Sequence, residues 1–405
     1  MEHDPVRVCE LLVGLGEVDV LGVDHDHGGD GELLGLHVRC RVPRPSCRGC
    51  GGGLWSDGVR VVELVDLPVF GRPVGLVWHK GRWRCPDRGC DTGSVTGQNP
   101  QIAPRRASMT TRAARWATRR VGGGRPVSDL ASELGCCWST VNKTVQRWGQ
   151  ALLDADTERI AQTDAVGLDE TLLCRAGRFK RKAWATSIVD VAGGKLLDIV
   201  PNRTAQAPAR WLLERSASWR ERIRWAALDL SGPYRATLDT ALPHAAQVAD
   251  PFHVIRLANN TLDEVRRRVQ NQTLGHRGRK GDPLYRSRKL LLCAHNNIAD
   301  AAGETKLLSL LEAGDPHGEV RNAWHAKETL RGIYDISDPE LGKITVDQLA
   351  VEFQDPYLPK EVNRLGRTIA RWSAQISNWH HARVSNAASE AVDNLIKRVK
   401  RVAFG

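Results

Sequence analysis

The chain has 405 residues, and its 58 Lys and Arg outnumber its 47 Asp and Glu, which gives a formal net charge of +11 and a pI near 9.3. This length allows two or three domains, and the absence of an 18-residue apolar run or a signal peptide excludes a membrane or secreted protein in our interpretation. We therefore expect a cytoplasmic protein with a polyanionic partner, nucleic acid first and an anionic membrane surface second.

The N-terminal part, residues 1–100, is predicted to be β-rich and to hold a structural metal. Two short-spaced cysteine pairs, "CRGC" and "CPDRGC", supply Cys47, Cys50, Cys85 and Cys90. Four thiolates about 2.3 Å from one ion make a closed tetrahedral zinc site. We expect a zinc ribbon here, with four unrelated thiols as the alternative and Cys40 as a possible substitute ligand.

The remaining cysteines that stand in apolar runs are expected to be small core residues. They are Cys136, Cys137, Cys174 and Cys293. In a cytoplasmic protein, none of these thiols is expected to form a disulfide.

Residues 101–160 are basic and predicted to be helical, and the stretch 125–149 has the pattern of a helix-turn-helix. Leu130, Ala131 and Leu134 share one helical face, Gly135 allows a sharp turn, and a second helix is expected near Trp138. Side chains that would face outward could contact bases and phosphates, namely Ser139, Thr140, Asn142, Lys143 and Gln146. An ordinary helical hairpin is the alternative interpretation.

Residues 165–254 alternate strand-like and helix-like runs in an α/β order of three strands, helix, strand, helix, strand. Asp169 lies inside the first apolar strand and Asp229 ends a later one. A buried acid is costly unless it is paired or bound to a cation, and two such strands side by side could hold Mg²⁺. The local alternative for Asp229 is a turn residue at the end of a strand.

The stretch "QVADPFHV" places His253 three residues after Asp250. Asp250 suits a helix N-cap and Pro251 suits the first helical position. Near the C-terminus, "SNAASEAVDNLIKRVKR" offers Glu390 as a third acid on a helix, with a solvated acid as the alternative. Lys397, Lys400 and Arg401 follow at helical spacing and would contact phosphates or form a solvated basic face.

The order of these features, from the cysteine pairs to "GLDET", "ALDLSGPYR", "ADPFHV" and the final "SN…E…N..IK..KR.A.G" run, resembles bacterial insertion-sequence transposases of the ISL3 type. The resemblance implies a multidomain α+β protein with an N-terminal zinc ribbon, a helix-turn-helix and an RNase H-like α/β catalytic domain. That domain would comprise residues 161–260, a helical insertion over 261–380 and a catalytic helix over 381–405.

On this resemblance Asp169 and Asp229 are the first two Mg²⁺ (or Mn²⁺) ligands and Glu390 is the last. Asp250 and His253 then support the site, and a competing assignment makes Asp250 the second ligand. The chain ends at "RVAFG", where similar proteins usually continue.

The activity implied is that of a DDE transposase, an enzyme that binds the terminal inverted repeats of its element as double-stranded DNA, cleaves them with Mg²⁺ and transfers the strands to target DNA. Such a protein would be associated with the nucleoid, have no membrane partner and work as a homo-oligomer on DNA. The alternative is a catalytically inactive or domesticated DNA-binding regulator that keeps structural Zn²⁺ and the helix-turn-helix.

Overall fold

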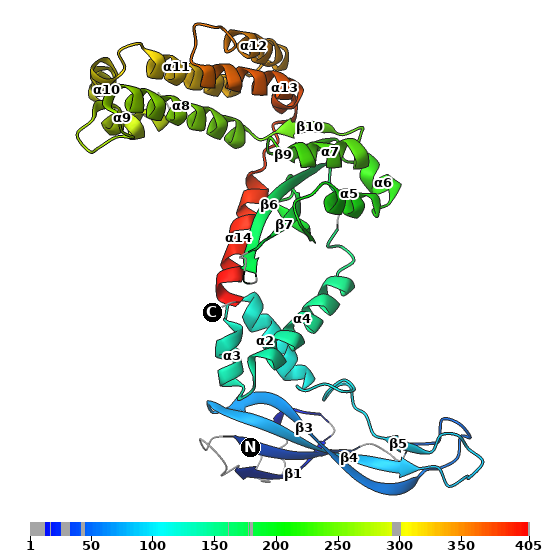
Figure 1. Ribbon diagram of the computed structural model, residues 1–405. Coiled ribbons are helices and arrows are strands. Elements are labelled where there is room, and N and C mark those ends of the chain that lie inside the picture. Colours follow the sequence, from blue (N-terminus) through cyan, green and yellow to red (C-terminus); the bar gives the residue numbers. More distant parts are fainter. Residues whose placement is uncertain are drawn as a thin grey trace. The chain divides into compact units, whose positions relative to one another are not determined.

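The computed structural model describes residues 13–16, 18–25, 33–41, 45–160, 162–176, 178, 181–293 and 301–403 (Figure 1). Contacts within the chain define two compact units. One comprises Met1–Arg159 with Arg398–Gly405, and the other comprises Ile160–Lys397. Among the described helices, none combines the length and apolar character that a membrane span requires. Phe404 and Gly405 of the C-terminal run lie outside the described residues.

The first unit contains a five-stranded sheet in the order β1-β2-β4-β3, with β5 paired to β4. Its strands are β1 (Val18–His25), β2 (Leu34–Cys40), β3 (Trp55–Val69), β4 (Arg72–Arg84) and β5 (Ser94–Thr96). β3 and β4 form a long antiparallel hairpin, and β2 joins β4 in parallel. Alternate residues of β4, Val74, Leu76 and Trp78, face a common apolar core.

Three helices follow the sheet: α2 (Thr111–Gly122), α3 (Val127–Glu133) and α4 (Trp138–Ala155). Leu130, Leu134 and Val141 are buried in the small core that these helices share. Gly135, between α3 and α4, has φ +61°, so the predicted sharp turn and the predicted helix start at Trp138 are both present. A Cβ at Gly135 would also lie 2.7 Å from Pro73 Cβ, so both the backbone and the packing favour glycine here.

The second unit is built on a mixed sheet in the order β10-β9-β6-β7-β8. Its strands are β6 (Ala165–Ala176), β7 (Arg181–Asp190), β8 (Lys195–Pro201), β9 (Trp225–Leu228) and β10 (Ala246–Ala249). The first three strands are antiparallel neighbours, and β9 and β10 extend the sheet in parallel with β6. Helices α5 (Gln206–Leu213), α6 (Ala217–Glu221) and α7 (Gly232–Ala241) connect the strands, so the predicted order of elements is confirmed.

The two faces of β6 have different neighbours, because successive side chains of a strand point to opposite sides of the sheet. Val166 and Leu168 point into the main apolar core of this unit. Gly167 and Asp169 lie on the opposite face, which α14 (Ala387–Ala403) approaches. A Cβ at Gly167 would lie 2.5 Å from Asn386 Oδ1 and 2.7 Å from Ser389 Oγ. Glycine at this position therefore lets the start of α14 approach the strand.

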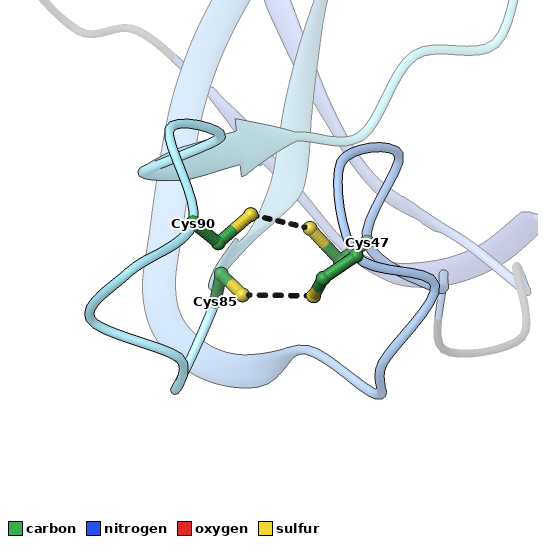
Figure 2. Close-up of side chains that lie close together, drawn as sticks. Cys47, Cys85 and Cys90 are labelled. Atoms are coloured by element: carbon green, nitrogen blue, oxygen red, sulfur yellow. Dashed lines mark hydrogen bonds between the residues drawn. The ribbon is translucent and has the colours of Figure 1, made fainter.

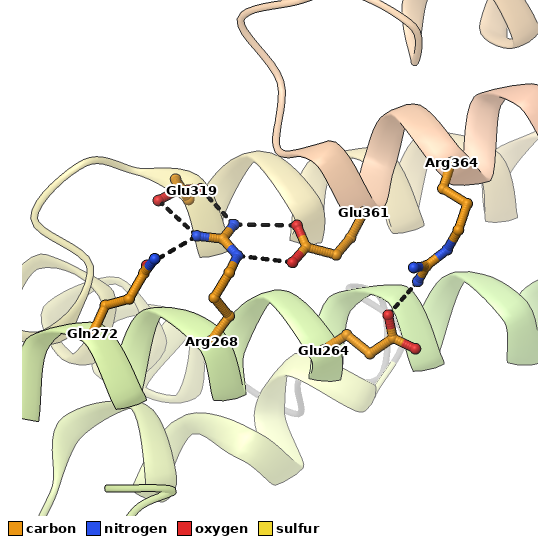
Figure 3. A network of polar contacts seen from close by, with 6 residues as sticks. All are labelled: Glu264, Arg268, Gln272, Glu319, Glu361 and Arg364. Carbon is orange, nitrogen blue, oxygen red and sulfur yellow. Dashed lines mark hydrogen bonds and ion pairs between the residues drawn. The ribbon is translucent and has the colours of Figure 1, made fainter. Parts of the chain in front are cut away.

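Between β10 and α14 the chain is helical, as predicted, over α8 (Pro251–Leu274), α9 (Pro283–Leu292), α10 (Ala301–Gly314), α11 (Glu319–Gly332), the short η2 (Ile333–Asp335), α12 (Pro339–Glu352) and α13 (Lys360–Ala382). Figure 3 shows Arg268 of α8 joined to carboxylates of two other helices. Its guanidinium donates to Glu319 of α11 at 2.6 Å and to Glu361 of α13 at 2.7 Å. These largely buried, paired charges connect α11 and α13 to the C-terminal part of α8.

Candidate functional site

Three acids stand in one row across the second sheet. Leu168 of β6 is in register with Leu228 of β9, which is in register with Ala249 of β10. The residues that come directly after these three in the chain are Asp169, still within β6, and Asp229 and Asp250, which follow the ends of β9 and β10. Because these strands are parallel, the row lies where β9 and β10 end, with Asp229 in the middle. The sequence prediction that separate acidic strands run side by side is therefore realised in this unit.

Asp169 is buried, with an exposed fraction of 8%. Its Oδ1 accepts the backbone N–H of Glu170 at 2.7 Å. The pKa of Asp169 is raised to about 7, mainly by burial and also by the nearby carboxylates of Asp393 and Asp229, whereas the hydrogen bond from Glu170 lowers it. The ionised form of this carboxyl is therefore unfavourable without a nearby positive charge. This is the property expected of a residue that binds a cation.

Asp229 directly follows β9 and begins the turn into α7. Its Oδ1 is buried and has no hydrogen-bond partner among the described residues. Burial raises the pKa of Asp229 more than any other influence, while the nearby His253 lowers it. A buried carboxylate oxygen with no donor is rare in proteins and matches an oxygen that would coordinate a cation.

Asp250 uses both carboxylate oxygens in hydrogen bonds. Oδ1 accepts the backbone N–H of Asn386 at 2.9 Å, immediately before α14. Oδ2 lies 3.0 Å from His253 Nδ1 and 3.3 Å from the backbone nitrogen of His253, so Asp250 is also the N-cap of α8. The hydrogen bond to Asp250 raises the pKa of His253. Both sequence interpretations of Asp250, N-cap and neighbour of the acids, are compatible with this geometry.

Glu390 lies on the first turn of α14 and is half-buried. Potential ligand atoms of Glu390, Asp250 and His253 all lie within 4.8 Å of one another. Asp169 and Asp229 are not part of that close set, although both interact electrostatically with His253. The structure thus brings Glu390, 221 residues after Asp169, into the same neighbourhood as the acids of the sheet.

Sequence reasoning missed two residues of this neighbourhood. Asp393 is buried and accepts a hydrogen bond of 3.0 Å from Ser187 Oγ, and Ser187 pairs with Asp169 across β6 and β7. Asn386 is fully buried, and its side-chain amide donates to the carbonyl of Leu168 at 3.2 Å. The one sequence signal for Asp393 was its position one helical turn after Glu390.

The residue types at this site fit a divalent cation of the Mg²⁺ class. The available ligands are carboxylate oxygens, which hard cations prefer. Asp229 Oδ1 lacks a partner among the described residues, and burial together with neighbouring acids raises the pKa of Asp169. One or two cations would relieve both conditions.

The first unit holds a second candidate metal site, made of the four predicted cysteines. Cys47, Cys50, Cys85 and Cys90 place their sulfur atoms within 4.8 Å of one another. The Sγ atoms of Cys47 and Cys90 are 3.6 Å apart, as are those of Cys50 and Cys85 (Figure 2). A tetrahedron with metal–sulfur bonds of about 2.3 Å has edges of about 3.8 Å. The cluster is therefore consistent with zinc.

The local backbone explains how the two cysteine pairs meet. Cys47 N–H donates to the carbonyl of Gly52 at 2.7 Å, which closes the first knuckle. A Cβ at Gly49 would lie 2.8 Å from Cys90 Sγ, so the glycine lets the second pair approach. Hydrogen bonding from Thr92 lowers the pKa of Cys47 to about 6, which favours the thiolate that a metal binds. Cys40 is outside the cluster, and Asn99 Nδ2 donates to its sulfur.

The expectation that four other cysteines are core residues is wrong for Cys137, Cys174 and Cys293, whereas Cys136 is partly buried against the core of the helices. Cys137 and Cys293 are exposed, and Cys136 and Cys174 are half-buried. Cys137 is the N-cap residue of α4, where its sulfur lies 3.2 Å from Ser139 Oγ and 3.0 Å from Thr140 Oγ1. The apolar run that suggested burial is thus the start of a helix whose first turn faces solvent.

The candidate DNA-contacting residues of α4 differ in accessibility. Ser139, Lys143 and Gln146 are exposed, whereas Thr140 and Asn142 are half-buried. On α14, Lys397 and Arg401 are exposed and Lys400 is half-buried. All eight side chains are therefore at least partly exposed to solvent, and three of the five on α4 are exposed.

A sheet with a row of acids, joined to a helix that carries a glutamate, is the arrangement that the resemblance to transposases led us to expect. The sequence profile of the ISL3-type DDE transposases, described as "Transposase", matches residues 166–405. This match covers more than half of the chain, so the protein belongs to the ISL3 family of DDE transposases.

Individual relatives agree with this family assignment. The chain is 25% identical to the transposase for insertion sequence element IS1557 of Mycobacterium tuberculosis over 441 positions, which cover 99% of this chain and 92% of the relative. It is 22% identical to the transposase for insertion sequence element IS1001 of Bordetella parapertussis over 402 positions, which cover 98% and 94%. The similarity thus extends over both units of the structure.

Proposed function

We propose that this protein binds the terminal inverted repeats of its own insertion sequence, cleaves DNA strands there with Mg²⁺ and joins the freed ends to target DNA. The observation that carries this proposal is the row of Asp169, Asp229 and Asp250, with Glu390 packed beside it. The strand order of the second sheet supports an RNase H-like catalytic domain, because three antiparallel strands are extended by two parallel ones.

Asp169, Asp229 and Glu390 are our choice of cation ligands. When bound, Mg²⁺ would activate the attacking hydroxyl and stabilise the leaving oxygen of the phosphodiester. Asp229 is preferred over Asp250 because Asp229 Oδ1 has no partner among the described residues, whereas both oxygens of Asp250 are engaged. Asp250 then positions the start of α14 through Asn386 and orients the imidazole of His253.

His253 would contribute positive charge to the site. The hydrogen bond to Asp250 raises the pKa of His253, which shifts its equilibrium toward the imidazolium. In its protonated form, the imidazole beside the acids would donate a hydrogen bond to a non-bridging phosphate oxygen. This role requires no covalent bond between protein and DNA.

The first unit would supply recognition of the element ends. We assign α3 and α4 as a helix-turn-helix whose exposed Ser139, Lys143 and Gln146 meet DNA. The four-cysteine cluster is assigned as a zinc ribbon that rigidifies the end of the β3–β4 hairpin. Pairing of two element ends implies at least a dimer in the DNA complex.

The proposal is tested by strand nicking on a duplex that carries an element end, with Mg²⁺ or Mn²⁺. Asp169→Asn and Glu390→Gln should each lower the nicking rate about a hundredfold or more, because each removes a ligand that stabilises the transition state. Asp239→Asn and Glu221→Gln, which change exposed acids of the same unit, are matched controls and should keep the rate within about twofold.

Equal nicking by all variants would contradict the catalytic assignment. An inactive wild-type protein that still binds element ends specifically would instead favour the DNA-binding regulator. Joined products, measured on a target plasmid, separate a transposase from a nuclease of the same fold.

A further inference from the structure

The first unit contains a basic recess that is separate from the four-cysteine cluster and from the outward face of α4. It has a volume of about 600 Å³ and lies over one face of the β3–β4 hairpin, closed on one side by residues 94–107. We call it the β3–β4 groove. Its floor is apolar, with Val62, Leu64 and Trp78. Its charged lining residues are all basic and, among the residues described, no acid lines it; the cations are Arg48, Arg60, Lys80, Arg105 and Arg106.

Two of these cations face each other directly. Arg60 of β3 and Lys80 of β4 are register partners in the antiparallel hairpin. Like charges at directly opposed positions destabilise a sheet. No ion pair joins either residue to a carboxylate in the part of the chain that the structure describes. Arg60 and Lys80 therefore repel each other in the free protein, and an anion bound between them would be attracted to both.

Lys80 is also unusually placed for a lysine, because only 9% of its surface is exposed. Its Nζ lies 3.9 Å from the centre of the Trp78 ring and donates to Gln98 Oε1 at 2.9 Å. Burial lowers the pKa of Lys80, and Arg60 lowers it further. An ammonium that is fixed and desolvated in this way is prepared for an anionic ligand at little entropic cost.

The groove continues toward α4. Arg106 lines both the β3–β4 groove and a smaller pocket of about 120 Å³ that also contains Lys143 and Arg147 of α4. Arg48, at the other side of the groove, lies between Cys47 and Cys50 of the metal cluster. A continuous basic path therefore joins the four-cysteine cluster, the hairpin and the helix assigned to DNA recognition.

We propose that the β3–β4 groove binds the phosphate backbone of duplex DNA, alongside the bases read by α4. Arginine and lysine are the usual partners of phosphates, and the amide and hydroxyl groups of Gln98 and Thr96 can add hydrogen bonds. A recess accepts a narrow ridge of phosphates, whereas a planar bilayer would not enter it. The choice of DNA as the polyanion rests on the proposed function, since Arg106 connects the groove to a pocket lined by α4.

The test measures the affinity of the full-length, zinc-loaded protein for a non-specific 30-base-pair duplex by fluorescence anisotropy, over a series of salt concentrations. Divalent cations are omitted so that cleavage does not interfere. R60Q/K80Q should lose about fivefold or more in affinity at 0.15 M salt. Its log–log salt slope should become shallower by about 1.8, since each phosphate contact contributes about 0.9.

The matched control is R39Q/R72Q, which removes the same charge from exposed positions of β2 and β4 that do not line the groove. Arg39 pairs weakly with Asp19, which keeps Arg41 as a partner. This control should leave affinity and slope unchanged. Identical slopes for both double variants, whether unchanged or equally reduced, would overturn the proposal.

Two further readings complete the experiment. R60Q alone, measured in the same binding assay, should lose affinity yet melt no lower than the wild type, because it relieves the repulsion, so its weaker binding is not caused by unfolding. Duplex RNA should bind less tightly than DNA, and a dependence on Arg60 and Lys80 seen for RNA alone would contradict the DNA assignment. Neither reading depends on nicking, so an inactive enzyme would count against the proposed function and not against the groove.

Discussion

At the scale of single residues, the acids of the second sheet are distinguished by what their oxygens contact. Asp250 is satisfied by Asn386 and His253, so it resembles a scaffold residue that also caps α8. Asp229 carries a buried oxygen without a donor among the described residues, and Asp169 has a pKa raised to about 7. Cation binding is therefore expected at Asp169 and Asp229, with Asp250 holding the start of α14 in place.

Cys137 provides a prediction that depends on pH. Hydrogen bonds from Ser139 and Thr140 lower the pKa of Cys137 to about 7, whereas burial raises the pKa of Cys136 to about 11. A lowered pKa means more thiolate at neutral pH, so the alkylation rate of Cys137 by iodoacetamide should rise with a midpoint near pH 7. Cys136 should remain largely unmodified at pH 8.

Mass spectrometry of the alkylated protein, resolved by peptide fragmentation, measures both rates. Thr140→Ala removes one donor and should move the Cys137 midpoint upward. A midpoint near the ordinary thiol value for Cys137, or equal labelling of the two neighbours, would show that the helix start is not arranged as described.

Residue-level prediction from the sequence succeeded where chemistry is local and failed where it depends on packing. The metal-binding cysteines could be recognised from their spacing, and Gly135 from the freedom of glycine to form a sharp turn. Asp393 could not be recognised, because its role comes from Ser187, which lies 206 positions earlier in the chain. Cys137 was misjudged because an apolar run was interpreted as core although it begins a solvent-facing helix turn.

At the scale of elements, the position of α14 is set by the surface that β6 offers. Gly167→Ala should push Asn386 and Ser389 away from the strand, because its Cβ would lie within 2.7 Å of both side chains. Glu390 would move with them, and we expect the nicking rate to fall about tenfold or more, since small displacements of catalytic groups are costly. The second unit should stay folded.

Nicking assays combined with circular dichroism check this prediction. Gly194→Ala is a poor control because Gly194 has φ +64°, whereas Gly232→Ala, with open space around its Cβ and ordinary φ, is a suitable one. Full activity in Gly167→Ala would mean that α14 does not depend on close packing against β6.

The order of elements between residues 165 and 254 could be predicted because each strand has an apolar run and each helix its own periodicity. Their register could not, since it depends on pairing between segments far apart in sequence. The row of Asp169, Asp229 and Asp250 is a consequence of that register. For residues 55–84 the sequence likewise predicted only a β-rich region and not the long β3–β4 hairpin.

At the scale of the whole molecule, the chain forms two compact units with separate cores. The five segments expected from the sequence remain predictions as independent domains. The metal cluster belongs to the first unit and sits in a very small core of Cys47, Leu54 and Cys85. A core of this size has little hydrophobic stabilisation of its own, so its order should depend on zinc.

Removal of zinc should therefore loosen residues 45–54 and 83–96 and leave the second sheet intact. Hydrogen exchange measured with and without a strong zinc chelator tests this, and amides of β6 and β9 serve as the internal control. We expect about a hundredfold loss of protection near the cluster, given the binding free energies typical of structural zinc. Unchanged protection there, or fewer than about 0.5 zinc equivalents in the purified protein, would count against the tetrathiolate site.

The central claim is that acids of the second unit form one cation centre, and anomalous diffraction from crystals of the DNA-bound protein soaked in Mn²⁺ tests it most directly. We predict a peak within about 2.4 Å of carboxylate oxygens of both Asp169 and Asp229, with Glu390 contributing to the same centre. Peaks confined to Asp250 and His253, or no Mn²⁺ at these acids, would contradict the account.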